Sequence, residues 1–469
     1  MAGGILGVAT SGLMAYQRAL QTTSHNIANV DTKGYNRQRV GQTAQDPQLL
    51  RGSYIGTGVK GDNVERVYDQ FLDEQVRHHS STHSELESYA KFATEIDNFI
   101  ADESTGLTGT LQNFFNAAQE VADDPTSVPS RQVLLSEANL LTDRFNTLHT
   151  RLADLQGQVG QGLTSTISDV NNFASEIAGL NNRIIVATGS SGGQPPNDLL
   201  DQRDQLVSEL AKTVDVKTLP QEDGALNVFI GTGQALVMGT TVSKMGTQPS
   251  AGDPEKLDIT LTVGTSTMNV TSTITGGELA GMMKFRDQIL TPTRSALDDI
   301  AVQLANDFNT QHRVGWDLDG NTNADFFKVP PVSSDGFAGA IKVEITDTRE
   351  IAASAVDTSS GAVGNNGNAL KLAELQVANN MLGNTASYHD AYGVITSDIG
   401  SKTHAAKVNE AAQKGLLDYS REAKESLSGV NLDEEAANLI KFQQAYQASA
   451  QVISAANSLF DTLLSAVRR

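Results

Sequence analysis

The chain has 469 residues, of which 39% are hydrophobic, and its 34 basic and 55 acidic side chains give a net charge of −21. This length predicts about three domains, and the hydrophobic content excludes a chain that is disordered throughout. The acidic charge argues against a general binder of nucleic acids or anionic membranes. Cysteine is absent, which excludes disulfides, thiolate catalysis and cysteine-based zinc sites. No apolar stretch is long enough to span a membrane.

The N-terminal segment departs from the overall charge. Residues 1–60 contain two acidic side chains, Asp31 and Asp46, and six basic ones: Arg18, Lys33, Arg37, Arg39, Arg51 and Lys60. This segment is either a solvated basic surface or a basic arm that meets the acidic body of a neighbouring copy. Residues 1–10 have neither a basic region nor a long apolar run, so we expect no cleaved secretory signal.

Both ends of the chain are predicted to be helices with a seven-residue repeat of mostly apolar positions. The N-terminal seam consists of Leu6, Ala9, Leu13, Tyr16, Leu20, Thr23, Ile27 and Val30. The C-terminal seam consists of Leu432, Ala436, Leu439, Gln443, Tyr446, Ala450, Ile453, Asn457, Phe460, Leu464 and Val467. Such helices could form a hairpin that closes a monomer. Their small, weakly charged outer faces favour packing against other copies instead.

A third and longer helical run extends from Leu134 to Ile184. It keeps the same spacing except for an extra four-residue step between Val159 and Leu163, which locally unwinds a supercoil. An unbroken helix of this length is a rod of about 80 Å. Shorter helices are predicted at 68–100, 107–121, 198–212 and 292–309.

Strand-like sequence is confined to the middle of the chain. Segments rich in Val, Ile and Thr predict strands at 214–219, 226–230, 235–238, 257–263 and 267–274, and residues 341–346 alternate as a further strand. Loops are predicted at 189–196 and 359–368. The fold class is therefore mainly α with a β subdomain. The terminal segments form a long coiled-coil hairpin or rod, and the β-rich part lies at its far end.

Motifs that carry chemistry are incomplete. Gly56-Thr-Gly58-Val-Lys-Gly61 has dinucleotide-binding spacing without the strand–turn–helix context. Ser191 has nucleophile-elbow spacing, but a helix precedes it and two prolines follow. The segment 317–325 resembles the start of an EF-hand without its glycine and bidentate glutamate, which indicates a tight polar turn with at most weak adventitious Ca²⁺ binding.

His79 and His83 lie one helical turn apart without further zinc ligands, and we interpret them as part of a solvated helix face. We therefore expect no catalytic residues, no cofactor and no metal site, and we predict that the chain is not an enzyme.

Residues 24–35, Ser-His-Asn-Ile-Ala-Asn-Val-Asp-Thr-Lys-Gly-Tyr, resemble the signature shared by flagellar rod, hook and hook-associated proteins, with Lys33 where the signature has proline. Segments at 55–59, 198–207, 276–279, 308–312 and 428–435 resemble the hook-associated protein 1 family, in the family's order and over nearly the whole chain. Asn26 and Asn29 are expected to bond the backbone at the end of the first helix, and Gly34 to adopt a positive φ.

The resemblance implies a structural subunit of the bacterial flagellum, an adaptor at the hook-filament junction. The partners it implies are further copies in a ring, the hook protein, a second hook-associated protein on the filament side, and a cytoplasmic export chaperone on the C-terminal helix. No nucleic acid or membrane is expected. The implied location is extracellular, after flagellar type III export without cleavage. The alternatives are another flagellar axial protein, an adhesin-like binding module on a helical stalk, or a hydrolase that uses Ser191.

The expected domains are a terminal coiled-coil domain (1–40 plus 425–469), a helical rod domain (41–213 plus 277–424) and a β-rich subdomain (214–276), with strand 341–346 as a candidate addition. Many family members carry a large outer β domain after the Phe326-Phe327 segment. Only residues 328–340 stand there, so we expect that domain to be absent. The residues expected to carry assembly are Leu6, Leu13, Tyr16, Leu20, Asn26, Ile27, Asn29, Gly34, Tyr35, Leu432, Leu439, Gln443, Tyr446, Ile453, Asn457, Phe460 and Leu464.

Overall fold

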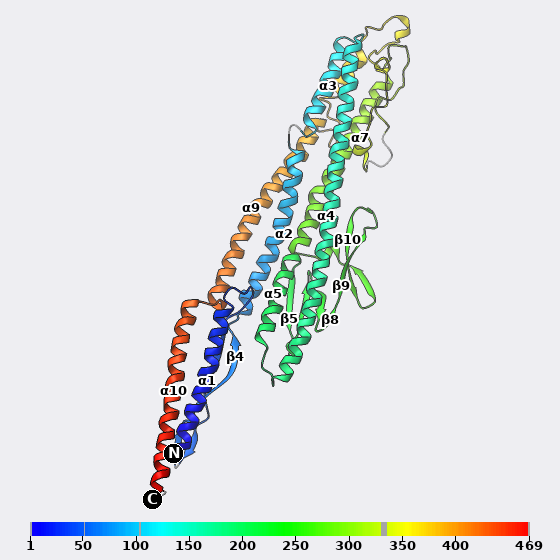
Figure 1. The fold of residues 1–469 in the computed structure, drawn as a ribbon. Coiled ribbons are helices and arrows are strands. Elements are labelled where there is room, and N and C mark those ends of the chain that lie inside the picture. Colours follow the sequence, from blue (N-terminus) through cyan, green and yellow to red (C-terminus); the bar gives the residue numbers. More distant parts are fainter. Residues whose placement is uncertain (1, 51, 103–104, 330–334, 468–469) are drawn as a thin grey trace.

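The computed structural model describes residues 2–50, 52–102, 105–329 and 335–467, and it is a long rod (Figure 1). Both termini lie at one end, and helix α3 (Thr108–Asp123) lies near the other. Helices dominate, and the strands are short. The predicted fold class, mainly α with a β subdomain, is confirmed.

The terminal end is a two-helix hairpin with a β-ribbon on it. Helix α1 (Ala2–Ala28) packs along α10 (Leu432–Val467). Strands β1 (Gln38–Ala44) and β4 (Val59–Arg66) pair antiparallel and lie on α1. Their connection is the small hairpin of β2 (Gln48–Leu50) and β3 (Ser53–Ile55).

This ribbon corrects the expectation that strands occur only in the middle of the chain. Strand β1 reads Gln-Arg-Val-Gly-Gln-Thr-Ala and is exposed over most of its length, so it lacks the apolar alternation by which a half-buried strand is predicted. The expected domain boundary after residue 40 divides β1.

The rod is built around α4 (Val128–Ser190), a single helix of 63 residues that confirms the predicted long run. Ser127 caps its start by accepting a hydrogen bond from the Ser130 N–H at 3.3 Å. The predicted seam is buried on both sides of the four-residue step, and Leu141, Phe145 and Val170 are fully buried. Helix α3 and helices α2 (Gln70–Ile100) and α5 (Asn197–Thr213) belong to the same bundle.

Helix α9 (Tyr388–Ser428) has 41 residues and packs along α2, and it was not predicted from the sequence. Several of its buried positions are small or polar, such as Thr403, Ala406 and Ser420, so its apolar periodicity is weak. Its start is marked by a capping box between Ser387 and Asp390, which is a sequence signal for a helix N-terminus.

Helix α6 (Gly277–Phe285) continues through a π-helical turn, Arg286–Leu290, into α7 (Thr291–Arg313). Only residues 292–309 were predicted as a helix. Pro292 has no N–H to donate, and the wider π turn directly before it accommodates this defect. The buried Arg286 donates from Nη1 to the Leu257 carbonyl at 2.6 Å and ties this helix to the β subdomain.

The β subdomain packs against the C-terminal half of α4, which corrects the expectation that it forms the far end of the rod (Figure 1). One antiparallel sheet has the order β5-β6-β7-β8 and the other the order β11-β10-β9. Their bounds are β5 Val216–Pro220, β6 Leu226–Ile230, β7 Gln234–Met238, β8 Thr241–Val242, β9 Lys244–Pro249, β10 Leu257–Val263 and β11 Ser266–Asn269. The strand predicted at 267–274 ends at Asn269, and Thr271–Thr273 is a 3-10 turn.

The far end is an irregular segment between α7 and α9 that contains α8 (Gly367–Glu374) and the 3-10 turns Phe337–Gly339, Thr348–Glu350 and Thr358–Ser360. The predicted strand 341–346 is wrong: Val343 makes only an isolated bridge to Phe327. The short Phe-Phe segment offers only a few residues to pair with, and both phenylalanines are buried among Phe114 and Phe308.

The continuous hydrophobic core extends from Tyr89 to Ala406. The terminal hairpin and the ribbon lie outside it, and so do the start of α2 and the end of α9. The terminal region, which consists of the hairpin and its ribbon, and the rod are therefore held together by contacts outside this core.

Candidate assembly surface and interdomain joint

Small residues form the buried face of α1. Ala9, Ala15 and Ala19 are each no more than 5% exposed. Gly12 faces α10 so closely that a Cβ there would lie 3.4 Å from the Ser449 hydroxyl oxygen. Gly12 lets the two hairpin helices approach closely, whereas Ala15 lies against Gly61 of β4, so part of this small-residue face packs on the ribbon.

The contact face of α10 corrects the predicted C-terminal seam. Leu439, Tyr446 and Ile453 are half-buried, as a seam requires, but Leu432, Gln443, Asn457, Phe460 and Leu464 are exposed. Ala456 and Glu435 are the buried residues of α10 among those whose exposure the structure describes. The helix is turned so that only part of the predicted seam meets α1. The side chain of Val467 lies outside the described residues.

On α1 the predicted seam is only partly covered. Leu6, Leu13, Tyr16, Leu20 and Ile27 are half-buried, and they flank the small-residue face.

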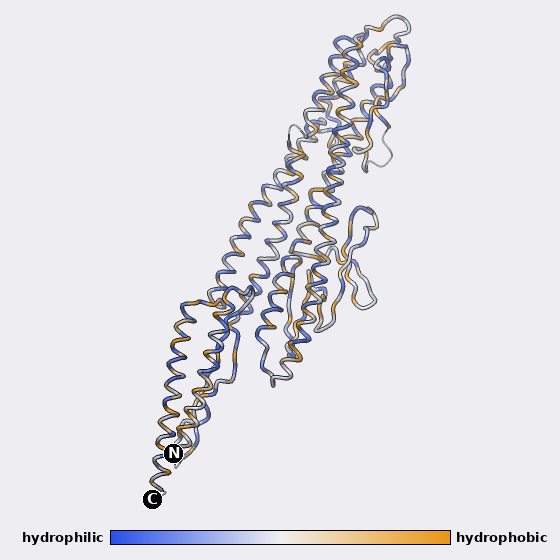
Figure 2. The backbone as a smooth tube through the Cα atoms, in the orientation of Figure 1, coloured by the Kyte–Doolittle hydropathy of each residue, from blue (hydrophilic) through white to orange (hydrophobic). Residues whose placement is uncertain are grey.

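Large apolar side chains remain on the surface of both terminal helices. Figure 2 shows hydrophobic residues along α1 and α10. The exposed ones are Ile5, Val8, Met14, Leu432, Ile440, Val452, Leu459, Phe460 and Leu464, with exposed fractions of 41% to 65%. The β2–β3 hairpin adds Leu49, Tyr54 and Ile55. Exposed apolar residues of this kind are typical of protein interaction surfaces.

The turn after α1 is organised by Asn26. Its buried side-chain amide donates from Nδ2 to the Gln38 carbonyl at 2.8 Å, and its Oδ1 accepts from the Gln38 N–H at 2.9 Å and from the Tyr35 hydroxyl at 2.7 Å. Asn26 thus pairs with β1 as a neighbouring strand would. Burial and the nearby carboxylates of Asp198 and Asp201 raise the pKa of Tyr35, so the phenol keeps the proton that it donates.

The expected roles of the other turn residues are confirmed. Asn29 donates from Nδ2 to the His25 carbonyl at 2.9 Å, where α1 ends. Gly34 has a φ of +80°, and a Cβ there would lie 2.7 Å from the Gln205 side chain, so both the backbone and the space demand glycine.

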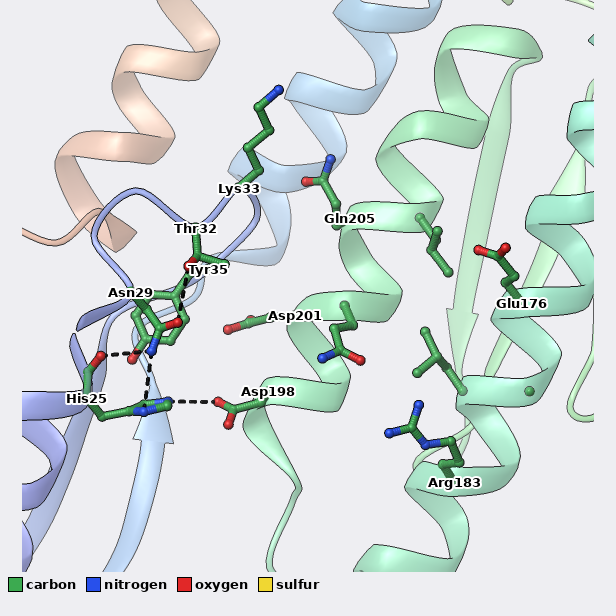
Figure 3. Close-up of a pocket in the computed structure, with 14 residues that line it drawn as sticks. His25, Asn29, Thr32, Lys33, Tyr35, Glu176, Arg183, Asp198, Asp201 and Gln205 are labelled. Atoms are coloured by element: carbon green, nitrogen blue, oxygen red, sulfur yellow. Dashed lines mark hydrogen bonds and ion pairs between the residues drawn. The ribbon is translucent and has the colours of Figure 1, made fainter. Parts of the chain in front are cut away.

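Three carboxylates of α5, those of Asp198, Asp201 and Asp204, bind this turn and the end of β4. Asp198 lies 3.2 Å from His25 Nε2 and accepts from Gln38 Nε2 at 2.8 Å. Asp201 accepts from the backbone and side chain of Asn36, and Arg66 bonds both Asp201 and Asp204. His25, Tyr35, Asp198 and Asp201 lie together in Figure 3, where they line a groove of about 660 Å³ between the turn and helices α4 and α5.

Arg37 ties the same turn to the break between α9 and α10. Its N–H donates to the Ser428 carbonyl at 2.9 Å, and its guanidinium pairs with Glu434 at 2.7 Å and with the buried Glu435 at 2.8 Å. The hydrogen bonds from Arg37 lower the pKa of Glu434. Arg18 also bonds within the chain, to the Gly61 carbonyl. Lys33 and Arg39 are exposed. Arg51 lies outside the described residues.

The chemical motifs do not converge on a site. The Ser191 hydroxyl donates to backbone carbonyls in an exposed turn, and the Gly56–Gly61 segment leads into strand β4 rather than a helix. The Asp317 carboxylate accepts from the N–H groups of Asp319 and Asn321, as in the predicted polar turn. Within the described residues, no group of three His, Asp or Glu side chains could hold a metal ion, and no helix has the length and hydropathy of a membrane span.

The solvated face assigned to His79 and His83 is wrong. Both side chains are half-buried between α2 and α9. His83 Nε2 lies 3.0 Å from a Glu410 carboxylate oxygen, and His79 Nδ1 lies 2.8 Å from Gln413 Nε2. They are packing residues between two helices, of which the second was not predicted.

Family models match three parts of the chain. The flagellar hook-associated protein FlgK helical domain matches residues 93–327. The flagellar basal body rod FlgEFG protein C-terminal model matches 425–466, and the flagella basal body rod protein model matches 6–36. The two basal body rod models match the helices of the terminal hairpin. The FlgK helical domain model matches much of the long bundle built around α4.

Curated relatives are similar over nearly the full length. Flagellar hook-associated protein 1 of Salmonella typhimurium is 33% identical over 98% of this chain and 99% of the relative. The protein of the same name from Escherichia coli K12 is 31% identical with the same coverage, and that from Bacillus subtilis is 28% identical over 98% of this chain and 97% of the relative.

A solved structure, that of the flagellar hook junction protein FlgK from Burkholderia pseudomallei, has the same fold. It superposes with a TM-score of 0.68 at 20% identity and covers 76% of this chain and 100% of its own. The full-length relatives and the matched helical domain indicate the same family as the segments of the turn and of α5 that resemble it. The chain therefore belongs to the flagellar hook-associated protein 1 family, whose members are structural proteins of the flagellum and not enzymes.

Proposed function

We propose that this chain is the adaptor at the hook-filament junction, and that copies of it form a ring through their terminal hairpins. The observation that carries this proposal is the distribution of apolar residues. The rod has a continuous core, whereas no described residue of α1 or α10 belongs to that core and both helices expose large apolar side chains along their length. Burying such a side chain contributes roughly 1.5–3 kcal/mol, so association of copies offsets the marginal stability of an isolated two-helix hairpin.

The assembly surface consists of the predicted residues that the single chain leaves exposed or half-covered. Leu6, Leu13, Tyr16, Leu20 and Ile27 line it on α1. Leu432, Leu439, Gln443, Tyr446, Ile453, Asn457, Phe460 and Leu464 line it on α10. Asn26, Asn29, Gly34 and Tyr35 act differently: they shape the turn that carries the hairpin and are engaged within the chain.

An adaptor meets a different polymer on each side of its ring. The partners are the hook protein on one side and a second hook-associated protein on the filament side. The alternative of another flagellar axial protein is disfavoured by the match of the helical domain and of the full-length relatives. A helical-stalk adhesin has no need of apolar residues along both terminal helices.

Three domains fit the packing. The terminal domain holds residues 1–40 and 425–469, and we add the ribbon 41–66 to it because β1 and β4 lie on α1. The rod domain then holds 67–213 and 277–424, and residues 214–276 form the β subdomain. A large outer domain is absent. In support, the Salmonella relative aligns over 548 positions and therefore carries residues that this shorter chain lacks.

Export precedes assembly. The subunit leaves the cell through the flagellar type III route without cleavage, and the assembled protein is extracellular. Before export, a cytoplasmic chaperone covers the exposed apolar face of α10. The same surface then binds first the chaperone and later other copies of the chain. The chaperone must therefore leave before copies associate.

The experiment is complementation of a strain that lacks the gene. The parent chain should restore filaments on hooks, and electron micrographs of isolated hooks should show the protein at their tips. Normal filaments in the deletion strain would refute the junction assignment. A mature protein that starts well after Met1 in culture supernatants would refute uncleaved export.

The double variant Phe460→Ala with Leu464→Ala tests the shared surface. It should bind the chaperone more weakly and assemble poorly while the rod stays folded. The matched control is Asp461→Ala, an exposed polar residue on the same turn. Chaperone binding and assembly equal to the parent chain would rule out the shared surface.

A further inference from the structure

The joint between the terminal hairpin and the rod is polar. The hydrophobic core begins at Tyr89 and ends at Ala406, so it does not reach the points where the chain passes from one region to the other, at residues 66–70 and 428–432. At these points the regions meet through hydrogen bonds and ion pairs, which are directional. Such contacts fix an orientation as well as a position.

Asp201 lies at the centre of the joint. It projects from α5 toward the turn (Figure 3) and is only 5% exposed. One carboxylate oxygen accepts from the Asn36 N–H at 3.1 Å, and the other accepts from Asn36 Nδ2 at 2.6 Å and from Arg66 Nη1 at 2.8 Å. One rod carboxylate thereby holds both the turn after α1 and the end of β4.

Arg66 completes the joint from the other side. Its guanidinium is 12% exposed, bridges Asp201 and Asp204 at 2.8 Å each, and lies over the Tyr68 ring at 4.9 Å from the ring centre. Arg66 is the last residue of β4 and stands just before α2, so it marks the point where the ribbon enters the rod. A buried charge pair of this kind is costly to break from one side, because the partner is left unpaired.

We propose that Asp201 and Arg66 are positioning residues that set the angle between the terminal hairpin and the rod. This inference goes beyond the adaptor function: it assigns to named residues the fixed orientation with which one subunit would present its two regions. It concerns the free chain, so it can fail while the junction assignment stands, and the reverse holds as well.

The absence of native cysteine allows a direct test with two spin labels on the full chain. Thr43→Cys places one label on the exposed face of β1, and Ser175→Cys places the other on the exposed face of α4. In the parent chain, pulsed electron-spin measurements should give one narrow distance distribution. Asp201→Ala and Arg66→Ala should each broaden it at least twofold, and Asp169→Ala, which removes an exposed carboxylate on α4, should leave it unchanged.

The sole tryptophan, Trp316, separates positioning from folding, because it lies at the far end of the rod. The midpoint of urea unfolding, followed by Trp316 fluorescence, should be the same in Asp201→Ala and in the parent chain. Asp201→Asn, which keeps an acceptor but not the charge, should give an intermediate width and serves if the alanine variant is insoluble. A narrow distribution in Asp201→Ala, a broad one in the parent, or a Trp316 midpoint that falls with Asp201→Ala would overturn the proposal.

Discussion

The helices α4 and α10 share a seven-residue apolar repeat but place it differently. In α4 the repeat is closed off: Leu141, Phe145 and Leu148 are fully buried. In α10 the repeat residues Leu432, Phe460 and Leu464 are 49% to 51% exposed. The comparison teaches that the same pattern serves folding where one chain supplies the whole bundle, and serves association where one chain supplies only part of it.

Substitution of one aromatic residue in each helix breaks the comparison most strongly. Phe145→Ala removes a ring that is fully buried in the rod and should lower the free energy of unfolding by about 3–5 kcal/mol. Phe460→Ala removes a half-exposed ring and should change it by less than about 0.5 kcal/mol in the free chain. Urea unfolding measures both, with Trp316 fluorescence as the signal for the rod and a probe at Thr43 as the signal for the terminal end. Equal effects in the two variants would show that α10 is packed as α4 is.

Loss of the amide at Asn26 should have the next largest effect. Asn26→Ala leaves the Gln38 N–H and the Tyr35 hydroxyl without their acceptor, which costs about 1–3 kcal/mol. The loss should be confined to the terminal end, so proteolysis there should accelerate while the Trp316 midpoint stays constant. A drop of that midpoint would instead make the turn part of the rod's cooperative unit. Asn29→Ala is the milder control, since Asn29 is only half-buried.

Acid should loosen the far end of the rod through His312. This side chain is fully buried, its Nδ1 lies 2.8 Å from the Ala324 carbonyl, and its Nε2 accepts from the Ala352 N–H at 3.0 Å. Burial lowers the pKa of His312, so the folded state favours the neutral ring.

The contribution of His312 to stability is complete above the unfolded-state pKa of about 6.5, and it decreases as the pH falls below that value toward the lowered folded-state pKa. Trp316 fluorescence between pH 7 and 4 should report the loss. His312→Gln should remove this part of the pH dependence, and an unchanged pH profile in that variant would contradict the assignment.

The pair at the base of α10 should show the smallest effect. Glu434 is 55% exposed and Glu435 is 2% exposed, and both bind Arg37. Glu434→Gln should cost at most about 1 kcal/mol, as exposed ion pairs do, and Glu435→Gln should cost more because its partner charge is buried with it. Thermal unfolding of the terminal end, followed by a probe at Thr43, ranks the two. The reverse ranking would mean that exposure does not govern this pair.

The helices with strong apolar periodicity could be predicted from the sequence. The seam of α4 from Leu134 to Ile184 was identified because its residues are large and regularly spaced. Helix α9 was not predicted because its buried residues include Thr403 and Ser420. The ribbon was not predicted because Val40 is the only large apolar residue of β1. The C-terminal seam was only partly correct. A repeat shows which residues share a helix face, but it does not show whether the same chain buries that face.

The site was predictable only in part. Asn26, Asn29 and Gly34 were identified with the correct local roles, because a helix end and its turn are local structure. Asp198, Asp201 and Asp204 stand three residues apart on α5, a spacing that places them on one helix face, and this signal was available. Their partners Asn36 and Arg66 are more than 130 residues away in the chain, and only tertiary structure brings them together.

Amide hydrogen exchange of the full chain, free and assembled on isolated hooks, tests the central claim most directly. In the free chain, the amides of α1 and α10 should exchange rapidly while those of α4 stay protected, because opening of the hairpin exposes little additional apolar surface. On hooks, α1 and α10 should become protected. Slow exchange of α1 and α10 in the free chain, at rates matching α4, would contradict the account.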